Sequence, residues 1–204
     1  MVPRQARSLL QIDNTMRTLL CLLLTMFLAV LLVGCSGKSE SKSESNDAQA
    51  QKAKESQAAA ITAIEKLGGE ITFDKKNPGK PLALSFWKVT DAGLVNLKGL
   101  TNLQSLYLNN TKVTDAGLVH LKGLTNLQSL YLINTKVTDA GLVNFKGLTN
   151  LKTLILISTK VSDAGLVHLK GLTNLQRLSL SRTKVTAAGV KELQAALPKC
   201  EIVK

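Results

Sequence analysis

Apolar residues recur through the second half of the chain with a fixed period of 24 residues. Sixteen of the 24 columns are identical in four copies without insertions, at residues 89–112, 113–136, 137–160 and 161–184. Leu106 and Leu108 alternate with polar or variable residues, which is the period-2 pattern of a strand with one buried face. Leu118 and Leu121 lie three residues apart, as on one face of a helix. Each copy therefore predicts a short strand, a loop, a short α- or 3₁₀-helix and a return.

Polar residues mark the start and the end of the predicted helix in each copy. Thr114 and Asp115 offer oxygen atoms that can cap its first turn. Lys122 would lie in its last turn, and Gly123 would follow as the residue that tolerates a left-handed C-cap. Because each aspartate of this column sits beside a Thr or Ser, we interpret all four as caps rather than paired catalytic carboxylates: Asp91, Asp115, Asp139 and Asp163.

The spacing Leu103-x-x-Leu106-x-Leu108-x-x-Thr111, repeated every 24 residues, resembles the leucine-rich repeat, with Thr in place of the usual Asn. One such unit cannot bury its leucines alone, whereas stacked units form a continuous core. The resemblance implies an α/β fold: a right-handed leucine-rich-repeat solenoid with a parallel concave sheet and convex short helices.

Atypical segments flank the four repeats and are expected to cap the open ends of the core. Residues 57–88 form the predicted N-terminal cap, with Ile61, Ile64 and Leu67 three apart on a helix. Trp87 occupies the column of Thr111, and we expect it to cover the core. Residues 185–204 form the predicted C-terminal capping repeat, in which the helix is lengthened.

The first 34 residues have the pattern of a signal peptide, because an apolar run at residues 19–33 follows Arg17. This run is short for a membrane-spanning helix. It ends in Leu-Val-Gly-Cys at residues 32–35, which resembles a bacterial lipobox and implies cleavage before Cys35 and attachment of diacylglycerol to its sulfur, with palmitate among the acyl chains. The alternatives are an ordinary signal peptide or a stub of an anchor, and translation could start at Met16.

Residues 35–56 are rich in Ser, Lys, Glu and Gln without apolar periodicity, so they predict a flexible tether after the lipidated cysteine. Alternatively, the alanine-rich part from about Asp47 extends the first helix. An exported protein with this anchor is expected on the outer membrane or the periplasmic face of a bacterial membrane.

The formal net charge of the chain is +12. Removing residues 1–34 takes away three Arg and one Asp, which leaves 23 basic against 13 acidic residues, or +10. In an exported protein this charge points away from nucleic acid and toward anionic headgroups, polysaccharide or acidic proteins. Each repeat carries two Lys and one Asp, so we interpret the surplus as an evenly spread solvated surface, with a dedicated anion site as the alternative.

No residue pattern predicts catalysis, a metal site or a cofactor. His120 and His168 share a helix column but lie two copies apart, roughly 20 Å if packed helices are 8–10 Å apart, so they cannot share a metal ion. We expect both to be exposed helix residues. Cys200 is the one cysteine beyond Cys35, and we interpret it as a small capping residue rather than a nucleophile.

The columns that differ between copies gather around the strand, where five of the eight variable columns lie. These side chains would point into the concave surface, and apolar ones cluster in the middle copies. We predict a partner-binding patch formed by Tyr107, Asn109, Tyr131, Ile133, Ile155, Ile157, Arg177 and Arg182. The alternative is that exposed positions drift without a function.

The chain resembles small bacterial leucine-rich-repeat lipoproteins, and its Val-Thr-Asp-Ala-Gly-Leu units are similar to the cysteine-containing subclass of the repeat. The cysteine of that subclass is absent from every copy, and there is no F-box segment, so a role in ubiquitin ligation does not follow. The resemblance implies binding to a partner, and our leading hypothesis is a monomeric, membrane-anchored, non-enzymatic module that binds a protein. The alternative is an envelope component whose basic surface holds an anionic polymer or lipid.

Overall fold

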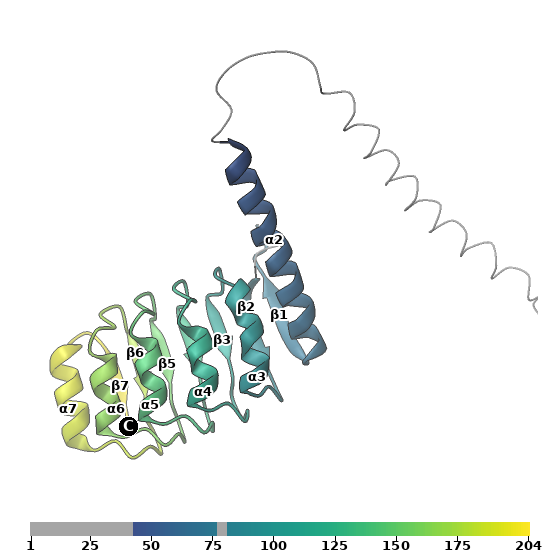
Figure 1. Cartoon of the computed structure of the whole chain (residues 1–204). Helices are drawn as coiled ribbons and strands as arrows, with labels where there is room; N and C mark the ends of the chain where they lie inside the picture. The colour runs from purple at the N-terminus through teal and green to yellow at the C-terminus, as the bar shows by residue number, and fades with distance from the viewer. Residues whose placement is uncertain (1–42, 77–80) are drawn as a thin grey trace, which may run out of the picture. The chain divides into compact units, whose positions relative to one another are not determined.

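The computed structural model describes residues 43–76 and 81–204 (Figure 1). The predicted signal peptide and Cys35 lie outside the described residues. A long helix, α2 (Ser43–Lys66), leads into a seven-stranded sheet. The strands are β1 (Gly69–Phe73), β2 (Pro81–Phe86), β3 (Ser105–Tyr107), β4 (Ser129–Tyr131), β5 (Thr153–Ile155), β6 (Arg177–Ser179) and β7 (Glu201–Val203).

Strand order follows the sequence, from β1 to β7. β1 pairs with β2 in antiparallel orientation, and every later pair is parallel. Equal columns of successive repeats face each other, so that Leu106 pairs with Leu130 and Leu130 with Leu154. The constant register follows from the constant 24-residue period, and it confirms the predicted α/β solenoid.

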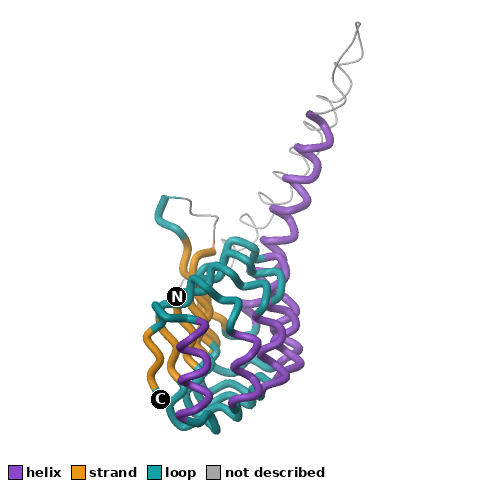
Figure 2. Tube along the Cα trace, turned by 90° about the vertical axis from the view of Figure 1, so that its left-hand side faces the viewer, coloured by secondary structure: helices purple, strands orange, loops and turns teal. Residues whose placement is uncertain are grey.

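Short helices form the other side of each repeat, and Figure 2 shows them apart from the strands, with loops between the two layers. Each full repeat contains a four-residue α-helix of sequence Asp-Ala-Gly-Leu followed by a 3₁₀-helix. The α-helices are α3 (Asp91–Leu94), α4 (Asp115–Leu118), α5 (Asp139–Leu142), α6 (Asp163–Leu166) and the longer α7 (Ala187–Ala196). The 3₁₀-helices are η2 (Val95–Gly99), η3 (Val119–Leu121), η4 (Val143–Phe145) and η5 (Val167–Leu169).

The core between these layers is a set of leucine ladders. In the repeat at 113–136, for example, Leu118, Leu121, Leu130 and Leu132 are all fully buried. The buried threonine of each repeat is satisfied locally, because the Thr135 hydroxyl donates to the carbonyl of Leu132 at 2.8 Å. A Thr can therefore replace the usual Asn at this column without leaving a buried polar group unpaired.

The aspartate ladder connects neighbouring repeats, and our prediction that these aspartates cap their own helices is wrong. Thr138 is the N-cap of α5, and its side chain accepts from Ala140 N. Asp115 instead accepts two hydrogen bonds from the next repeat, from Thr138 N at 2.8 Å and from Thr138 Oγ1 at 2.6 Å. The same pair of bonds joins Asp91 to Thr114, Asp139 to Ser162 and Asp163 to Thr186.

The predicted left-handed glycine after each helix is also wrong. Gly68 is the only glycine with positive φ among the described residues, so Gly123 does not form such a cap. The left-handed residues lie after the strands instead, with φ between 54° and 58°, at Asn110, Asn134, Ser158 and Arg182. Asn tolerates this conformation better than most residues, which explains its presence in two copies.

Helix α2 corrects the predicted tether within residues 43–56, which are helical rather than flexible, and it bears out the alternative in which the part from about Asp47 extends the first helix. Its Ala, Gln, Lys and Glu residues have high intrinsic helix propensity, although they carry little apolar pattern. The end of α2 caps the core as predicted, with Ile64 fully buried and Ala60 8% exposed. Residues 47–204 form one compact unit.

Three further side chains differ in exposure from what the sequence predicted. Trp87 is 70% exposed, so it does not cover the core. His120 and His168 are half-buried rather than exposed, because the helix turns the preceding valines outward instead. These valines are 42–50% exposed: Val95, Val119, Val143 and Val167. The equivalent Asn144 is buried, and its side chain donates to the carbonyl of Gly141 at 3.0 Å. A polar side chain in this column can therefore form a hydrogen bond with the helix backbone of its own repeat.

Candidate binding face of the sheet

The outer face of the sheet carries the variable columns of the repeats. Leu106 points into the core, and its neighbours Ser105 and Tyr107 are half-buried on the opposite face, as strand alternation requires. The register places Tyr107 beside Tyr131, and Tyr131 beside Ile155. Three of the predicted residues therefore form a row of neighbouring side chains.

Tyr107 and Tyr131 form the centre of this face. Their rings are stacked, with centroids 4.5 Å apart and planes inclined by 16°. Each ring therefore covers one side of the other and leaves its second side toward the flanking strands. The stacked pair separates two hollows on the same face.

The larger hollow, of about 350 Å³, lies on the C-terminal side of the pair. It brings together five of the predicted site residues: Tyr131, Ile133, Ile155, Ile157 and Arg177. It also includes Thr153, Ser179 and Val203, which our sequence reasoning missed. Val203 belongs to β7, and its contribution could have been found by aligning residues 201–203 with the strand columns of the preceding repeats.

The smaller hollow, of about 250 Å³, lies on the other side and is lined by Ser85, Phe86, Trp87, Tyr107, Asn109 and Asn110. Trp87 was missed here because its column was read as a core position. The structure explains the difference, because the Thr of this column donates its hydroxyl to a carbonyl three residues back, and an indole in place of Thr cannot do this in the same way.

The predicted residues differ in how accessible they are. Tyr131, Ile133 and Ile157 are half-buried, whereas Ile155 is only 8% exposed because both neighbouring strands cover it. The side chain of Asn109 already forms a hydrogen bond within the protein, since its Oδ1 accepts from the backbone N–H of Ile133 at 3.0 Å. Arg182 is exposed at the left-handed turn after β6 and does not line the larger hollow.

Charged side chains lie at the two ends of this face. At the N-terminal end, Glu70 of β1 is exposed and pairs with Ser85, which pairs in turn with Tyr107. Arg177 is exposed at the start of β6, and Glu201 of β7 is its partner in the strand register. The rest of the larger hollow is lined by aromatic, aliphatic and hydroxyl side chains. Such a surface suits apolar contact with a few polar anchors.

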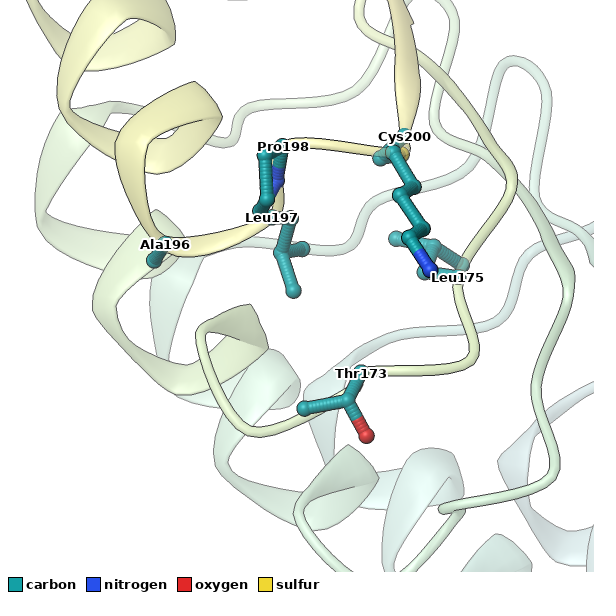
Figure 3. A pocket seen from close by; sticks show the side chains of 7 residues that line it. Thr173, Leu175, Ala196, Leu197, Pro198 and Cys200 are labelled. Carbon is teal, nitrogen blue, oxygen red and sulfur yellow. The ribbon is translucent and has the colours of Figure 1, made fainter.

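A third hollow, of about 210 Å³, lies at the C-terminal end of the repeats and is shown in Figure 3. Cys200 lies on its wall with Leu175 and Leu197. The thiol is free and buried, and this burial, together with nearby Glu201, raises its pKa. A raised thiol pKa lowers the thiolate fraction at neutral pH, so Cys200 is a poor nucleophile, in keeping with a capping role.

No group of three or more His, Cys, Asp or Glu side chains that could hold a metal ion occurs within residues 43–76 and 81–204. In the same ranges, no helix combines the length and the apolar character needed to cross a bilayer. His120 and His168 lie two repeats apart on η3 and η5, and the structure does not bring them together.

Comparison with known proteins identifies the repeat. The family described as "Leucine Rich repeats (2 copies)" matches residues 101–144, and "Leucine Rich repeat" matches residues 171–193. The chain thus carries leucine-rich repeats, which are typical of protein-interaction domains and generally belong to non-enzymatic scaffolds.

Several solved structures are similar to this chain. A leucine-rich-repeat protein of Leptospira interrogans is 27% identical over 54% of this chain and 27% of its own, with a TM-score of 0.44. An internalin of Listeria monocytogenes is 24% identical over 59% of this chain and 40% of its own, with a TM-score of 0.43. Internalin C2 of the same species is 24% identical over 71% of each chain, with a TM-score of 0.46.

The chain therefore spans 27% and 40% of the length of the first two of these proteins. No match was found among curated proteins.

Proposed function

We propose that this chain is a membrane-anchored, non-enzymatic lipoprotein that binds a protein partner through the outer face of its sheet. The anchor is the lipidated Cys35, and the protein is exported to the outer membrane or the periplasmic face of a bacterial membrane. The partner contacts the larger hollow and the stacked tyrosines beside it. The chain acts as a monomer.

The anchor rests on the sequence around Cys35. An apolar run at residues 19–33 precedes Gly34 and Cys35, in the order that resembles a lipobox. Two or more acyl chains anchor a protein stably, whereas one gives only marginal membrane binding. The repeats then need no membrane-spanning helix of their own.

The partner site rests on one observation: the variable columns place aromatic and aliphatic side chains around a hollow on the outside of the sheet. Tyr131, Ile133 and Ile157 keep part of their surface exposed there, although apolar side chains of this size gain from burial. Tyr and Arg are enriched among the residues that dominate binding energy in protein interfaces. Tyr131 and Arg177 occupy the two sides of this hollow.

The test is a pair of charged substitutions, Ile133→Asp with Ile157→Asp, on the full chain used as bait in envelope extracts. Both side chains are half-buried and line the hollow, whereas Ile155 is too buried to be replaced by Asp without harm to the fold. A charge left unpaired in an apolar contact is costly, so the double variant should lose its partner. The circular dichroism spectrum should remain that of the unaltered chain.

The matched control is Val119→Asp with Val143→Asp, which places the same two charges in adjacent repeats on the helical side. These valines are 44% and 42% exposed, so the fold should tolerate them equally well. The control variant should retain the partner. A folded Ile133/Ile157 variant that holds the partner as strongly as the control would show that the outer face of the sheet is not the site.

A further inference from the structure

The lysines of the repeats form two rows on opposite edges of the solenoid. One row lies at the end of each 3₁₀-helix, and we call it the lysine edge: Lys98, Lys122, Lys146 and Lys170. The other row precedes the N-cap of each helix and lies at the opposite edge: Lys112, Lys136, Lys160 and Lys184. The basic charge is therefore ordered in lines rather than spread evenly.

The two rows differ in the acidic groups near them. The aspartate ladder lies at the helix starts, so three of the four lysines of the opposite row, Lys112, Lys136 and Lys160, have an aspartate three residues further along the chain. The lysine edge has no repeated acidic column. Within the described ranges its one ion pair joins Lys170 to Glu192, at 2.6 Å, while Lys98, Lys122 and Lys146 are exposed and have no ion pair.

More basic and hydroxyl groups continue this edge. Lys152 is exposed in the loop that leads to β5, and Lys199 lines the hollow that also contains Thr173. One exposed threonine per repeat lies three residues after the lysine: Thr101, Thr125, Thr149 and Thr173. The edge thus presents ammonium and hydroxyl donors, which together suit the oxygen atoms of phosphate groups.

A glycine follows each lysine of this edge, and neither packing nor backbone conformation requires it in the middle and later repeats. A Cβ added at Gly123 or Gly171 would meet no heavy atom within 4 Å, and neither residue has positive φ. Each glycine instead leaves no side chain directly beside the lysine that it follows. A flat charged surface can then approach the ammonium groups closely.

Helix α2 leaves the repeats on the same side. Its last residues lie near the start of α3, since Leu67 is close to Gly93, and Ser56 and Ala60 lie beside Gly99 at the end of η2. The helix therefore runs antiparallel to α3 and η2. Residues 47–55, within the same compact unit, continue past the lysine edge for about 14 Å at the α-helical rise of ~1.5 Å per residue. The described helix thus leaves the repeats at the lysine edge.

We propose that the lysine edge docks on anionic lipid headgroups and holds the repeats edge-on at the membrane surface. This inference rests on the lipid anchor of the proposed function, which brings the edge near a bilayer. Basic side chains close to an anionic leaflet are attracted to it, and the attraction is lost within a Debye length. Docking by this edge leaves the outer face of the sheet accessible to a protein partner.

The experiment measures lysine acetylation on the full, lipid-modified chain in vesicles of phosphatidylcholine alone or of phosphatidylcholine with phosphatidylglycerol. Mass spectrometry after brief treatment with a water-soluble acetylating reagent compares the two rows within one molecule. We expect Lys98, Lys122 and Lys146 to react about fivefold more slowly in the anionic vesicles, from roughly 1 kcal/mol of attraction per lysine. Lys112, Lys136 and Lys160 of the opposite row are the internal control and should react equally in both vesicles.

High salt should remove the protection while the chain still floats with the vesicles, because the charges are screened and the acyl chains are not. Equal acetylation of both rows in anionic vesicles would overturn the proposal, and so would equal protection in phosphatidylcholine alone. Protection by soluble inorganic polyphosphate but not by vesicles would overturn it in favour of a polymer ligand.

A failed anchor is recognised separately, since the chain would then not float with phosphatidylcholine vesicles. In that event anionic vesicles added to the dissolved chain still test the edge by the same readout. A variant with Lys98→Glu, Lys122→Glu and Lys146→Glu should no longer dock, so that Lys199, which continues the edge, should react equally in both vesicles. The equal change at Lys112, Lys136 and Lys160 should keep the protection of Lys199.

Discussion

Each aspartate of the ladder accepts two hydrogen bonds from the following repeat, and this contact dictates the glycine beside it. A Cβ at Gly141 would clash with the Asp115 carboxylate and come within 2.8 Å of Leu118 Cδ1. Gly117 and Gly165 are equally close to the aspartate of the preceding repeat. The Asp and the Gly of the Val-Thr-Asp-Ala-Gly-Leu unit thus form one inter-repeat contact, while the glycine that follows each lysine has no such role in the middle copies.

Two glycine substitutions test this distinction. Gly141→Ala should destabilise the protein by about 1–3 kcal/mol, because the methyl group overpacks a closed contact. Gly171→Ala should raise stability by about 0.5 kcal/mol, because it restricts the unfolded chain and meets nothing in the folded one. Urea unfolding midpoints of the two variants provide the comparison. Equal shifts in the same direction would mean that the contact around Gly141 is not closed.

The aspartate contact also predicts a pH dependence at Asp163. The hydrogen bond from the Thr186 hydroxyl, followed by that from the Thr186 backbone N–H, lowers the pKa of Asp163. A carboxyl group with a lowered folded-state pKa stabilises the protein above its unfolded pKa, which is about 4, and this stabilisation is lost as the pH falls through the folded value.

Asp163→Asn should therefore lower the urea midpoint by a constant amount between about pH 5 and pH 8, and by less at each step below about pH 4. The measurement is a series of urea titrations of both proteins across this range. A difference that stays constant down to pH 2 would contradict the role of the charged carboxylate.

At the scale of the elements, helix α2 and strand β1 close the N-terminal end of the core. Ile64 of α2 is fully buried, and β1 pairs antiparallel with β2. Ile64→Ala should cost about 2–5 kcal/mol as a core truncation. Thr62→Ala, at an exposed position of the same helix, should change stability by less than about 0.5 kcal/mol.

In a repeat protein each unit contacts only its neighbours, so the damage from Ile64→Ala should be local. Hydrogen exchange should show lost protection in β1, β2 and β3, with β6 keeping most of its protection. Uniform loss along the sheet would instead mean that the whole solenoid unfolds as one unit.

The elements that sequence reasoning predicted are those that depend on a contact within one repeat. The strand at Leu106 and the helix at Leu118 follow from local periodicity, and both are present. Two of the errors concern features that do not depend on a contact within one repeat. The acceptor role of Asp115 depends on Thr138 in the next copy, and α2 begins at Ser43 because of helix propensity in a segment with little apolar pattern.

For the binding face, the sequence predicted which side chains are neighbours but not how exposed each of them is. The register of identical repeats was enough to place Tyr131 beside Ile155. It could not show that Ile155 would be covered by its neighbours, or that Trp87 would be exposed, because both depend on how adjacent side chains fill the face.

At the scale of the whole molecule, the proposed lipid anchor at Cys35 determines whether the repeats are held at a membrane. Cys35→Ser should prevent lipid attachment and leave the precursor segment uncleaved, since the resemblance to a lipobox makes both steps depend on the thiol. Mass spectrometry of the membrane fraction tests this expectation. A Cys35→Ser protein that is membrane-bound and lacks residues 1–34 would show that another signal directs the chain.

The central claim is that the outer face of the sheet contacts a protein partner, and a photo-crosslinking amino acid placed on that face tests it most directly. The probe replaces Ile157, which lines the larger hollow, or Val143, which is 42% exposed on the helical side. After illumination of intact cells, the account predicts one discrete crosslinked protein with the Ile157 probe and none with the Val143 probe. A discrete product from Val143 alone, or the same product from both positions, would contradict it.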